Sequence, residues 1–257
     1  MDTADIKDMV RIHYGAIAAS AASACCAPAT ACCGPQDTSR MAGYSEAERA
    51  AVPEGANLGL GCGNPRAIAA LRPGEVVVDL GSGAGFDCFL AAAQVGPTGR
   101  VIGVDMTHEM LKKARANAAA AGTANVEFRL GEIEHLPIGD NTVDAILSNC
   151  VVNLVPDKAQ VFREAFRVLK SGGRLAISDV VNRTALPAHL AADPALLCGC
   201  VSGAAPIARI EAWLADAGFT AIHITPQPES RALIATWAPG TGIEDYVVSA
   251  VIEARKP

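Results

Sequence analysis

The sequence contains no uninterrupted apolar run of the roughly 20 residues that a membrane-spanning helix needs, although 51% of its residues are hydrophobic. It contains no basic stripe either, and its net charge is −6, so we expect neither a nucleic-acid partner nor a membrane partner. The first residues do not lead from a basic end into an apolar stretch, because charged and polar residues interrupt them: Asp2, Asp5, Lys7, Asp8, Arg11 and His13. A secretory signal is therefore not expected.

Cysteine, in contrast, is abundant, with nine residues in a chain of 257. A disulfide framework would require an oxidising compartment, and nothing else in the sequence indicates one. The odd number also leaves at least one cysteine without a partner in the chain. We interpret the cysteines as reduced thiols that serve as ligands or redox groups in a cytoplasmic protein.

The chain divides into three parts. Residues 1–57 form an Ala-rich lead-in with two vicinal cysteine pairs, at 25–26 and 32–33, in a stretch whose composition indicates loop. Residues 58–183 alternate short β-branched runs with helix-forming segments. Residues 184–257 form a smaller α+β part that begins with a loop-rich stretch.

The alternating elements predict an α/β fold. Strands are expected at 76–80, 100–106, 126–130, 143–151 and 174–181, with helices at 86–95, 109–121 and 158–169. Gly122 and the pair Gly172-Gly173 are interpreted as helix stops. The last part adds a helix at 207–217 and strands at 220–225 and 246–253. Such alternation predicts a doubly wound, mostly parallel, Rossmann-like sheet with helices on both faces.

A glycine-rich loop follows the first strand of this predicted sheet. In Val-Val-Val-Asp-Leu-Gly-Ser-Gly-Ala-Gly, residues 76–85, the turn into the helix is made by Gly81, Ser82, Gly83 and Gly85. Glycines let the backbone approach a ligand closely at the carboxyl edge of a sheet. The spacing departs from the G-x-G-x-x-G of dinucleotide sites. Preceded by Asp79, it resembles the loop of class I S-adenosylmethionine-dependent methyltransferases.

An acid at the end of the second strand supports the same ligand. Asp105 stands 24 residues after Gly81, where a carboxylate can accept hydrogen bonds from both hydroxyls of a ribose. Met106 and Thr107 follow it and are expected near the adenine. Glu132 and Ile133, at the end of the third strand, are expected at the adenine edge. The cofactor that these residues imply is S-adenosylmethionine.

Three cysteines stand in loops where a methyl acceptor would wait. Cys150 follows the fourth strand, and Cys62 and Cys200 are flanked by small residues. Ligands of open parallel sheets bind outside the carboxyl ends of the strands, where such loops converge. Thiolates bind soft ions, and trivalent arsenic takes three sulfurs and keeps a lone pair that can attack a sulfonium methyl. Zinc typically takes four ligands.

Four segments resemble the arsenite methyltransferase family: Gly-Leu-Gly-Cys-Gly-Asn-Pro at 59–65, Ser-Asn-Cys-Val-Val-Asn-Leu at 148–154, Cys-Val-Ser-Gly-Ala at 200–204 and Trp-Ala-Pro-Gly-Thr-Gly-Ile-Glu-Asp-Tyr-Val-Val-Ser-Ala at 237–250. The resemblance implies an arsenic-detoxifying enzyme that methylates arsenite or its glutathione conjugate. It places the arsenic-binding thiolates on Cys62, Cys150 and Cys200. Cofactor contacts fall on residues 79–85, 105–107 and 132–133 and on Asn149.

The resemblance also implies a redox pair. An N-terminal cysteine of the family can form a disulfide with the position of Cys62, and Cys33 or Cys32 is the candidate here. A thioredoxin or glutathione system would then restore the thiols. Cys198, two residues before Cys200, is an alternative third ligand, and Cys88 is expected in the core. The vicinal N-terminal thiols either capture metalloid, shuttle electrons or have no defined role.

Two other functions fit part of the sequence. A methyltransferase of a small organic acceptor, such as a quinone, shares the segment from Val76 to Asp105 but has no use for three loop cysteines. A non-catalytic metalloid-binding protein that keeps a disused fold would use the vicinal thiols for capture and would not bind S-adenosylmethionine.

Overall fold

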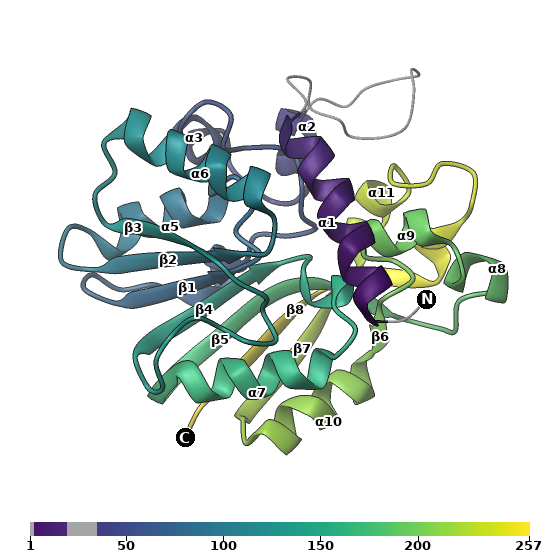
Figure 1. Ribbon diagram of the computed structural model, residues 1–257. Coiled ribbons are helices and arrows are strands. Elements are labelled where there is room, and N and C mark those ends of the chain that lie inside the picture. The colour runs from purple at the N-terminus through teal and green to yellow at the C-terminus, as the bar shows by residue number, and fades with distance from the viewer. Residues whose placement is uncertain (1–2, 20–34) are drawn as a thin grey trace.

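The computed structural model describes residues 3–19 and 35–257. Figure 1 shows one twisted sheet with helices packed on both of its faces. Helices α5 (Phe86–Val95) and α6 (His108–Ala121) cover one face, and α7 (Lys158–Val168) and α10 (Ile207–Ala217) cover the other. The predicted α/β fold with helices on both faces is therefore confirmed.

The strand order of the sheet is β3-β2-β1-β4-β5-β8-β7. The strands span Val76–Leu80 (β1), Arg100–Asp105 (β2), Val126–Leu130 (β3), Val143–Asn149 (β4), Leu169–Asn182 (β5), Thr220–Gln227 (β7) and Val247–Arg255 (β8), and the short β6 (Ala205–Pro206) pairs with β5. Strands β1 to β5 are parallel, whereas β8 runs antiparallel to both of its neighbours. The order reverses between β1 and β4, which places a crevice at the carboxyl ends of these two strands.

The central strands are apolar because helices cover both of their faces. Val77, Val78 and Leu80 of β1 are completely buried, as are Ile146 and Leu147 of β4. A strand covered on both sides reads as a continuous apolar run, without the alternation of a half-exposed strand. This explains why β1 was predicted with its exact bounds.

Helix α7 is set by a cap and an apolar stripe. The Asp157 side chain accepts a hydrogen bond from the backbone N–H of Gln160 at 2.9 Å and so caps the first turn. Buried residues at 161, 162, 165 and 168 follow helical spacing on the face turned to the sheet. Trp213 of α10 packs beside Phe162, with ring centroids 6.5 Å apart, so the two helices share one core.

The interpretation of Gly172-Gly173 as a helix stop is wrong. Helix α7 ends at Val168 and β5 begins at once with Leu169, so both glycines lie inside the strand. The N–H of Gly172 donates to the carbonyl of Lys256 at 2.9 Å, and the carbonyl of Gly173 accepts from the N–H of Lys256 at 3.0 Å. Gly122, in contrast, ends α6 at φ 63°, as predicted.

The lead-in contains helices that the sequence pattern did not predict. Helix α1 (Thr3–Ala19) packs against α6 and against α9 (Pro194–Cys198), and it crosses in front of the strand ends in Figure 1. Its buried residues are few and include Val10, Gly15 and Ile17, so its apolar stripe is weak. Further short helices are α2 (Pro35–Met41), α3 (Glu46–Ala50), α4 (Pro65–Ala69), α8 (Ala188–Ala191) and α11 (Arg231–Ile234), with single 3₁₀ turns at Val152–Leu154, Pro228–Ser230 and Ile243–Asp245.

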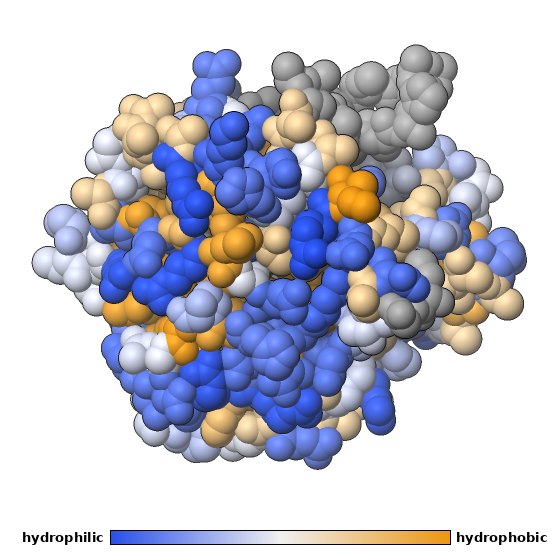
Figure 2. All heavy atoms as spheres, viewed as in Figure 1, coloured by the Kyte–Doolittle hydropathy of each residue, from blue (hydrophilic) through white to orange (hydrophobic). Residues whose placement is uncertain are grey.

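The segment after residue 183 completes the sheet rather than standing apart from it, because β7 and β8 extend it beyond β5. A boundary between functional parts near residue 183 therefore stays a prediction. Among the described residues, no helix has both the length and the apolarity to cross a lipid bilayer. The face in Figure 2 is largely hydrophilic over α7, with small hydrophobic patches near α1; the exposed large hydrophobic residues include Ile12 and Leu130.

Candidate functional site

A cavity of about 610 Å³ lies at the carboxyl ends of β1, β2 and β4. The glycine loop, α1 and the turns around Cys150 and Cys200 line it, and Trp237 closes part of it. Its position matches the crevice that the strand order creates. The cavity therefore brings most of the predicted cofactor residues together with Cys150, Cys200 and the alternative ligand Cys198, whereas Gly85, Glu132 and Cys62 do not line it.

The glycine loop needs its glycines for close packing. Gly81 has φ 69°, and a Cβ there would overlap the side chain of Val151. Gly83, at φ 51°, donates its N–H to Asp105 Oδ2 at 2.9 Å. The loop is thus fixed to β2, and it lines the cavity with its backbone exposed to a ligand.

Asp105 is held by backbone donors at the end of β2. Besides the bond from Gly83, its Oδ1 accepts from the N–H of Thr107 at 2.8 Å. Burial raises the pKa of Asp105, and these backbone hydrogen bonds oppose the shift. Asp105, Met106 and Thr107 all line the cavity, where the sequence placed the ribose and adenine of the cofactor.

Asp79 is buried directly beneath the loop. The thiol of Cys88 donates to its Oδ2 at 3.2 Å, so the core cysteine predicted from the sequence also supports the floor of the site. Burial, followed by the charge of Asp87, raises the pKa of Asp79 well above its usual value. A positively charged ligand in the cavity would favour the ionised forms of Asp79 and Asp105 and so oppose these pKa shifts.

The third strand end differs in part from the prediction. Ile133 lines the cavity, but the structure does not bring Glu132 to it. Glu132 turns outward and pairs with Lys7 of α1, with an N–O distance of 2.6 Å. The residue that faces the cavity is Glu134, which also pairs with Lys7, at 3.0 Å, and which sequence reasoning missed. Lys7 therefore attaches α1 to the segment after β3, where the sequence predicted the adenine edge of the cofactor.

Asn149 organises the loop that carries Cys62. Its Oδ1 accepts from the N–H of Cys62 at 3.0 Å, and its Nδ2 donates to the carbonyl of Gly63 at 2.8 Å. The same Nδ2 lies 3.0 Å from the hydroxyl of Tyr44 and 3.3 Å from Asp87 Oδ2. These contacts attach the thiol loop to β4. Asn149 also lines the cavity, and its contact with the cofactor stays a prediction.

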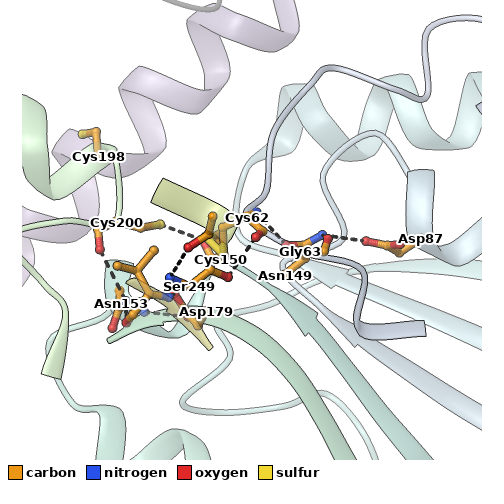
Figure 3. The surroundings of a disulfide bond; sticks show 12 residues. Cys62, Gly63, Asp87, Asn149, Cys150, Asn153, Asp179, Cys198, Cys200 and Ser249 are labelled. Carbon is orange, nitrogen blue, oxygen red and sulfur yellow. Dashed lines mark hydrogen bonds between the residues drawn. A yellow bond between two sulfur atoms is a disulfide. The ribbon is translucent and has the colours of Figure 1, made fainter. Parts of the chain in front are cut away.

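Cys62, Cys150 and Cys200 meet at one place, as Figure 3 shows, and Cys150 and Cys200 line the cavity. Cys62 and Cys150 form a disulfide with a Cα–Cα distance of 5.9 Å. The thiol of Cys200 donates to the carbonyl oxygen of Cys150 at 2.8 Å. All three are nearly inaccessible to solvent, with exposed fractions of 3%, 7% and 3%. Cys198 stands apart from them on α9 in Figure 3.

Two of the three thiol residues have unusual backbone conformations. Cys150 has φ 57° and Cys200 has φ 62°, the left-handed region that residues with a Cβ rarely adopt. Such positions persist where the surrounding structure fixes them, and they gather at functional sites. Cys150 directly follows β4, Cys200 follows the short helix α9 by two residues, and both thiols lie in the cluster. A sequence gives no sign of this geometry.

The structure adds Asp179 of β5 to the thiol cluster. One of its carboxylate oxygens and the sulfurs of Cys62 and Cys150 lie within 4.8 Å of one another. Burial raises the pKa of Asp179 to about 6, although the N–H groups of Val180 and Asn153 and the Lys158 ammonium oppose the shift. Sequence reasoning missed this residue, although an acid inside the apolar run of β5 is a signal in itself.

Asn153 joins Asp179 to the Cys200 turn. Its Nδ2 donates to Asp179 Oδ1 at 2.8 Å, to the carbonyl of Val180 at 2.6 Å and to that of Cys200 at 3.3 Å. A Cβ at Gly203 would overlap the carbonyl of Asn153, so this turn needs a glycine to pack closely. Burial, followed by the charges of Asp179 and Cys198, raises the pKa of the Cys200 thiol, and Lys158 opposes the shift.

The predicted redox partners Cys32 and Cys33 lie outside the described residues, as do Cys25 and Cys26. Their pairing with Cys62 stays a prediction. In this structure the partner of Cys62 is Cys150 instead, and Cys88, Cys198 and Cys200 are the free thiols of the described part.

The fold and the cavity define a class I, S-adenosylmethionine-dependent methyltransferase. A family model described as a methyltransferase domain matches residues 71–218, more than half of the chain. The chain is 50% identical over its whole length to the arsenite methyltransferase of Halobacterium salinarum, of which it covers 68%. This chain belongs to the arsenite methyltransferase family.

Two further relatives agree with this assignment. The arsenite methyltransferase of Aquipseudomonas alcaligenes is 40% identical over 77% of this chain, and the alignment covers 58% of that protein. The crystal structure of an arsenic(III) S-adenosylmethionine methyltransferase from Chlamydomonas reinhardtii superposes with a TM-score of 0.62 and 30% identity. It covers 85% of this chain and 72% of that one. The chain is thus shorter than the curated relatives, spanning about two thirds of the halobacterial protein and less of the other.

Proposed function

We propose that the protein methylates trivalent arsenic with S-adenosylmethionine, as a step of arsenic detoxification in the cytoplasm. The observation that carries this proposal is the convergence of three sulfurs from distant loops beside the cofactor cavity. Cys62 and Cys150 approach closely enough to form a bond, and the Cys200 thiol touches the carbonyl of Cys150. A soft atom that takes three sulfur ligands fits such a cluster.

Arsenic binding requires the disulfide to be opened first. A two-electron reduction of Cys62–Cys150 gives two thiols beside that of Cys200. Arsenite then exchanges its three hydroxides for three thiolates, and the thiol protons leave with the hydroxides as water. No general base is needed for this exchange, which suits a Cys200 thiol whose pKa burial raises. We propose a thioredoxin or glutathione system as the reductant.

Methyl transfer follows without a proton to remove. The arsenic lone pair forms the new As–C bond while the S–C bond of the sulfonium breaks and its electron pair stays on sulfur. The products are S-adenosylhomocysteine and a methylated arsenic that is formally oxidised by two electrons. Two sulfur ligands that leave together as a disulfide return arsenic to the trivalent state. The Cys62–Cys150 bond is a disulfide of this kind, and Cys33 or Cys32 with Cys62 is a second candidate.

The protein contributes mainly positioning in this scheme. The glycine loop, Asp105 and Thr107 would bind the nucleoside, and Asp79 lies beneath the loop with its carboxylate buried. Holding the nucleophile and the methyl carbon in line can supply several kcal/mol of barrier reduction, of the order of 7–11 in favourable cases.

The test is a product assay with the purified, reduced protein, arsenite and S-adenosylmethionine. We expect methylated arsenic and S-adenosylhomocysteine in equal amounts, and resolving the mono-, di- and trimethyl products gives the extent of methylation. Cys150→Ser should abolish the reaction and leave S-adenosylmethionine binding intact. Normal turnover by that variant would refute the mechanism. Activity on a demethylated quinone in place of arsenite would favour the organic-acceptor alternative.

A further inference from the structure

Methyl transfer moves a positive charge. Before the reaction the charge is on the sulfonium of S-adenosylmethionine; afterwards it is on an arsenic bonded to one carbon and three sulfurs. A group that stabilises a cation at the thiol cluster would therefore act on the transition state more than on the bound substrates. The three sulfur atoms cannot be this group, because they are already the ligands of arsenic.

Asp179 has the position that such a group requires. Its carboxylate oxygen lies within 4.8 Å of the sulfurs of both Cys62 and Cys150, and all three residues are buried. At this range and away from water, a unit charge acts far more strongly than it does in bulk solvent. Among the cysteine, histidine, aspartate and glutamate side chains of the described residues, these three form the group that meets at such short range.

The carboxylate is also fixed in place. Oδ1 accepts from Asn153 Nδ2 at 2.8 Å and from the N–H of Val180 at 2.7 Å, and Oδ2 accepts from the N–H of Asn153 at 3.3 Å. These donors stabilise the ionised form and occupy its lone pairs, so Asp179 is better suited to act through its charge than as an arsenic ligand. A charge fixed beforehand needs no reorganisation during the reaction.

We propose that Asp179 stabilises the positive charge that develops on arsenic during methyl transfer. This inference rests on the proposed function, since it requires arsenic to be bound at the three thiols. In the step itself the arsenic lone pair becomes the As–C bond and the S–C pair stays on sulfur. Asp179 forms no bond, breaks none and transfers no proton. Its negative charge remains beside the arsenic atom, which becomes cationic.

Lys158 is the charged group that opposes this role. It is partly buried, and its charge interacts with Asp179, Cys200 and Glu134. Burial lowers the pKa of Lys158, and the three neighbouring groups oppose the shift. Its Nζ donates to the carbonyl of Val155 at 2.9 Å, and no ion pair within 4.0 Å joins it to Asp179 in the described part of the chain. Lys158 therefore does not neutralise the Asp179 carboxylate by direct contact.

The experiment measures the single-turnover rate of methyl transfer with reduced protein, saturating arsenite and saturating S-adenosylmethionine. We expect Asp179→Asn to lower this rate roughly 100- to 1000-fold, the range found when one preorganised electrostatic group is removed. The dissociation constants of arsenite and of S-adenosylmethionine should stay within about threefold of wild type, because the charge acts only as it develops. Asp179→Glu, which keeps the charge, should retain more of the rate.

Two controls make the result specific. Asp157→Asn removes an exposed carboxylate, the cap of α7, and should keep the wild-type rate. Asp179→Ser is a second neutral variant, so that the outcome does not depend on how one substitution folds. A wild-type rate in either neutral variant, or a loss of arsenite binding in proportion to the loss of rate, would overturn the role of the charge. An inactive wild type would overturn the proposed function as well.

Discussion

The side-chain oxygen of Asn149 accepts a hydrogen bond from the backbone N–H of Cys62 at 3.0 Å. Because Asn149 is the neighbour of Cys150 in the chain, this amide attaches the Cys62 loop to the end of β4. A second bond, from Ser249 Oγ to the Cys62 carbonyl, attaches the same loop to β8. The disulfide joins the two sulfurs in this structure, and these polar contacts are expected to keep the two thiols close together after it is reduced.

Asn149→Ala should weaken arsenite binding more than cofactor binding. We expect about a tenfold loss of arsenite affinity, the effect of removing hydrogen bonds worth about 1.5 kcal/mol. Parallel titrations of the reduced variant with arsenite and with S-adenosylmethionine check this. Tyr44→Phe is the matched control, because it removes a hydroxyl that accepts from the same amide at 3.0 Å and leaves the Cys62 loop attached. Equal losses for both ligands would contradict the role given to Asn149.

Cys200→Ser and Cys198→Ser should differ sharply. Cys200 meets the other two thiols, whereas Cys198 sits on α9 with its carbonyl accepting from the Tyr14 hydroxyl at 2.9 Å. We expect kcat/KM for arsenite to fall by about two orders of magnitude in Cys200→Ser, as misplaced reacting groups cause, and to change little in Cys198→Ser. The reverse result in steady-state assays would make Cys198 the third ligand.

Lys7→Met should accelerate the release of S-adenosylmethionine. Burial lowers the pKa of Lys7, but its hydrogen bonds to Glu132 and Glu134 outweigh this and raise the pKa overall. These contacts fasten α1, whose Val10, His13 and Tyr14 line the cavity. Loss of a partly buried pair worth about 1 kcal/mol predicts a dissociation rate about fivefold higher. Stopped-flow displacement of the cofactor measures it; Arg11→Met, which removes a more exposed cation of the same helix, is the control.

Asp179 should make stability depend on pH. Its pKa rises from 3.8 to about 6 on folding because burial disfavours the charge. The folded protein therefore binds a proton that the unfolded chain has released, and this stability is lost as the pH rises from about 4 through about 6. The shift corresponds to about 3 kcal/mol. In urea unfolding, the free energy of unfolding of Asp179→Asn minus that of wild type should increase over this range and stay level above it. If the free energies of unfolding of the two proteins changed in parallel with pH, the prediction would be contradicted.

The two predictions for Asp179 are linked. A buried, ionised carboxylate reduces the stability of the fold at neutral pH, and it is expected to be kept because the reaction needs its charge. Asp179→Asn should therefore be more stable and slower than wild type at the same pH. A variant that is both less stable and slower would point to a structural role.

The sequence could predict the cofactor side of the site because its signals are local. A strand, a glycine loop and a helix follow one another at residues 76–95, and Asp105 ends the neighbouring strand, so both had to meet at one edge. The thiols were predicted from their place in loops at the strand ends and from short motifs that resemble a family. Cys62 and Cys150 are 88 residues apart, and only the folded chain shows that they touch.

Other features could not be predicted, for physical reasons. Helix α1 has too few buried residues to produce a clear stripe, because much of its inner face lines the cavity instead of packing in a core. The pair Gly172-Gly173 was interpreted as a helix end because glycines often end helices at a positive φ. In the structure, Gly172 has a positive φ inside strand β5 instead. Glu132 was expected at the cofactor because it ends the third strand. Its ion pair with Lys7 could not be foreseen, because the two residues are 125 positions apart.

Ser249 links the earliest thiol of the cluster to the last strand of the sheet. Its hydroxyl donates to the Cys62 carbonyl across 187 residues of sequence, and its own N–H donates to Ser230 at 3.0 Å. The chemistry of this protein therefore cannot be transplanted by moving one contiguous segment to another scaffold. A donor fragment would have to include β8, the turn at Pro228–Ser230 that Ser249 contacts and the loop before β1, which together span almost the entire domain.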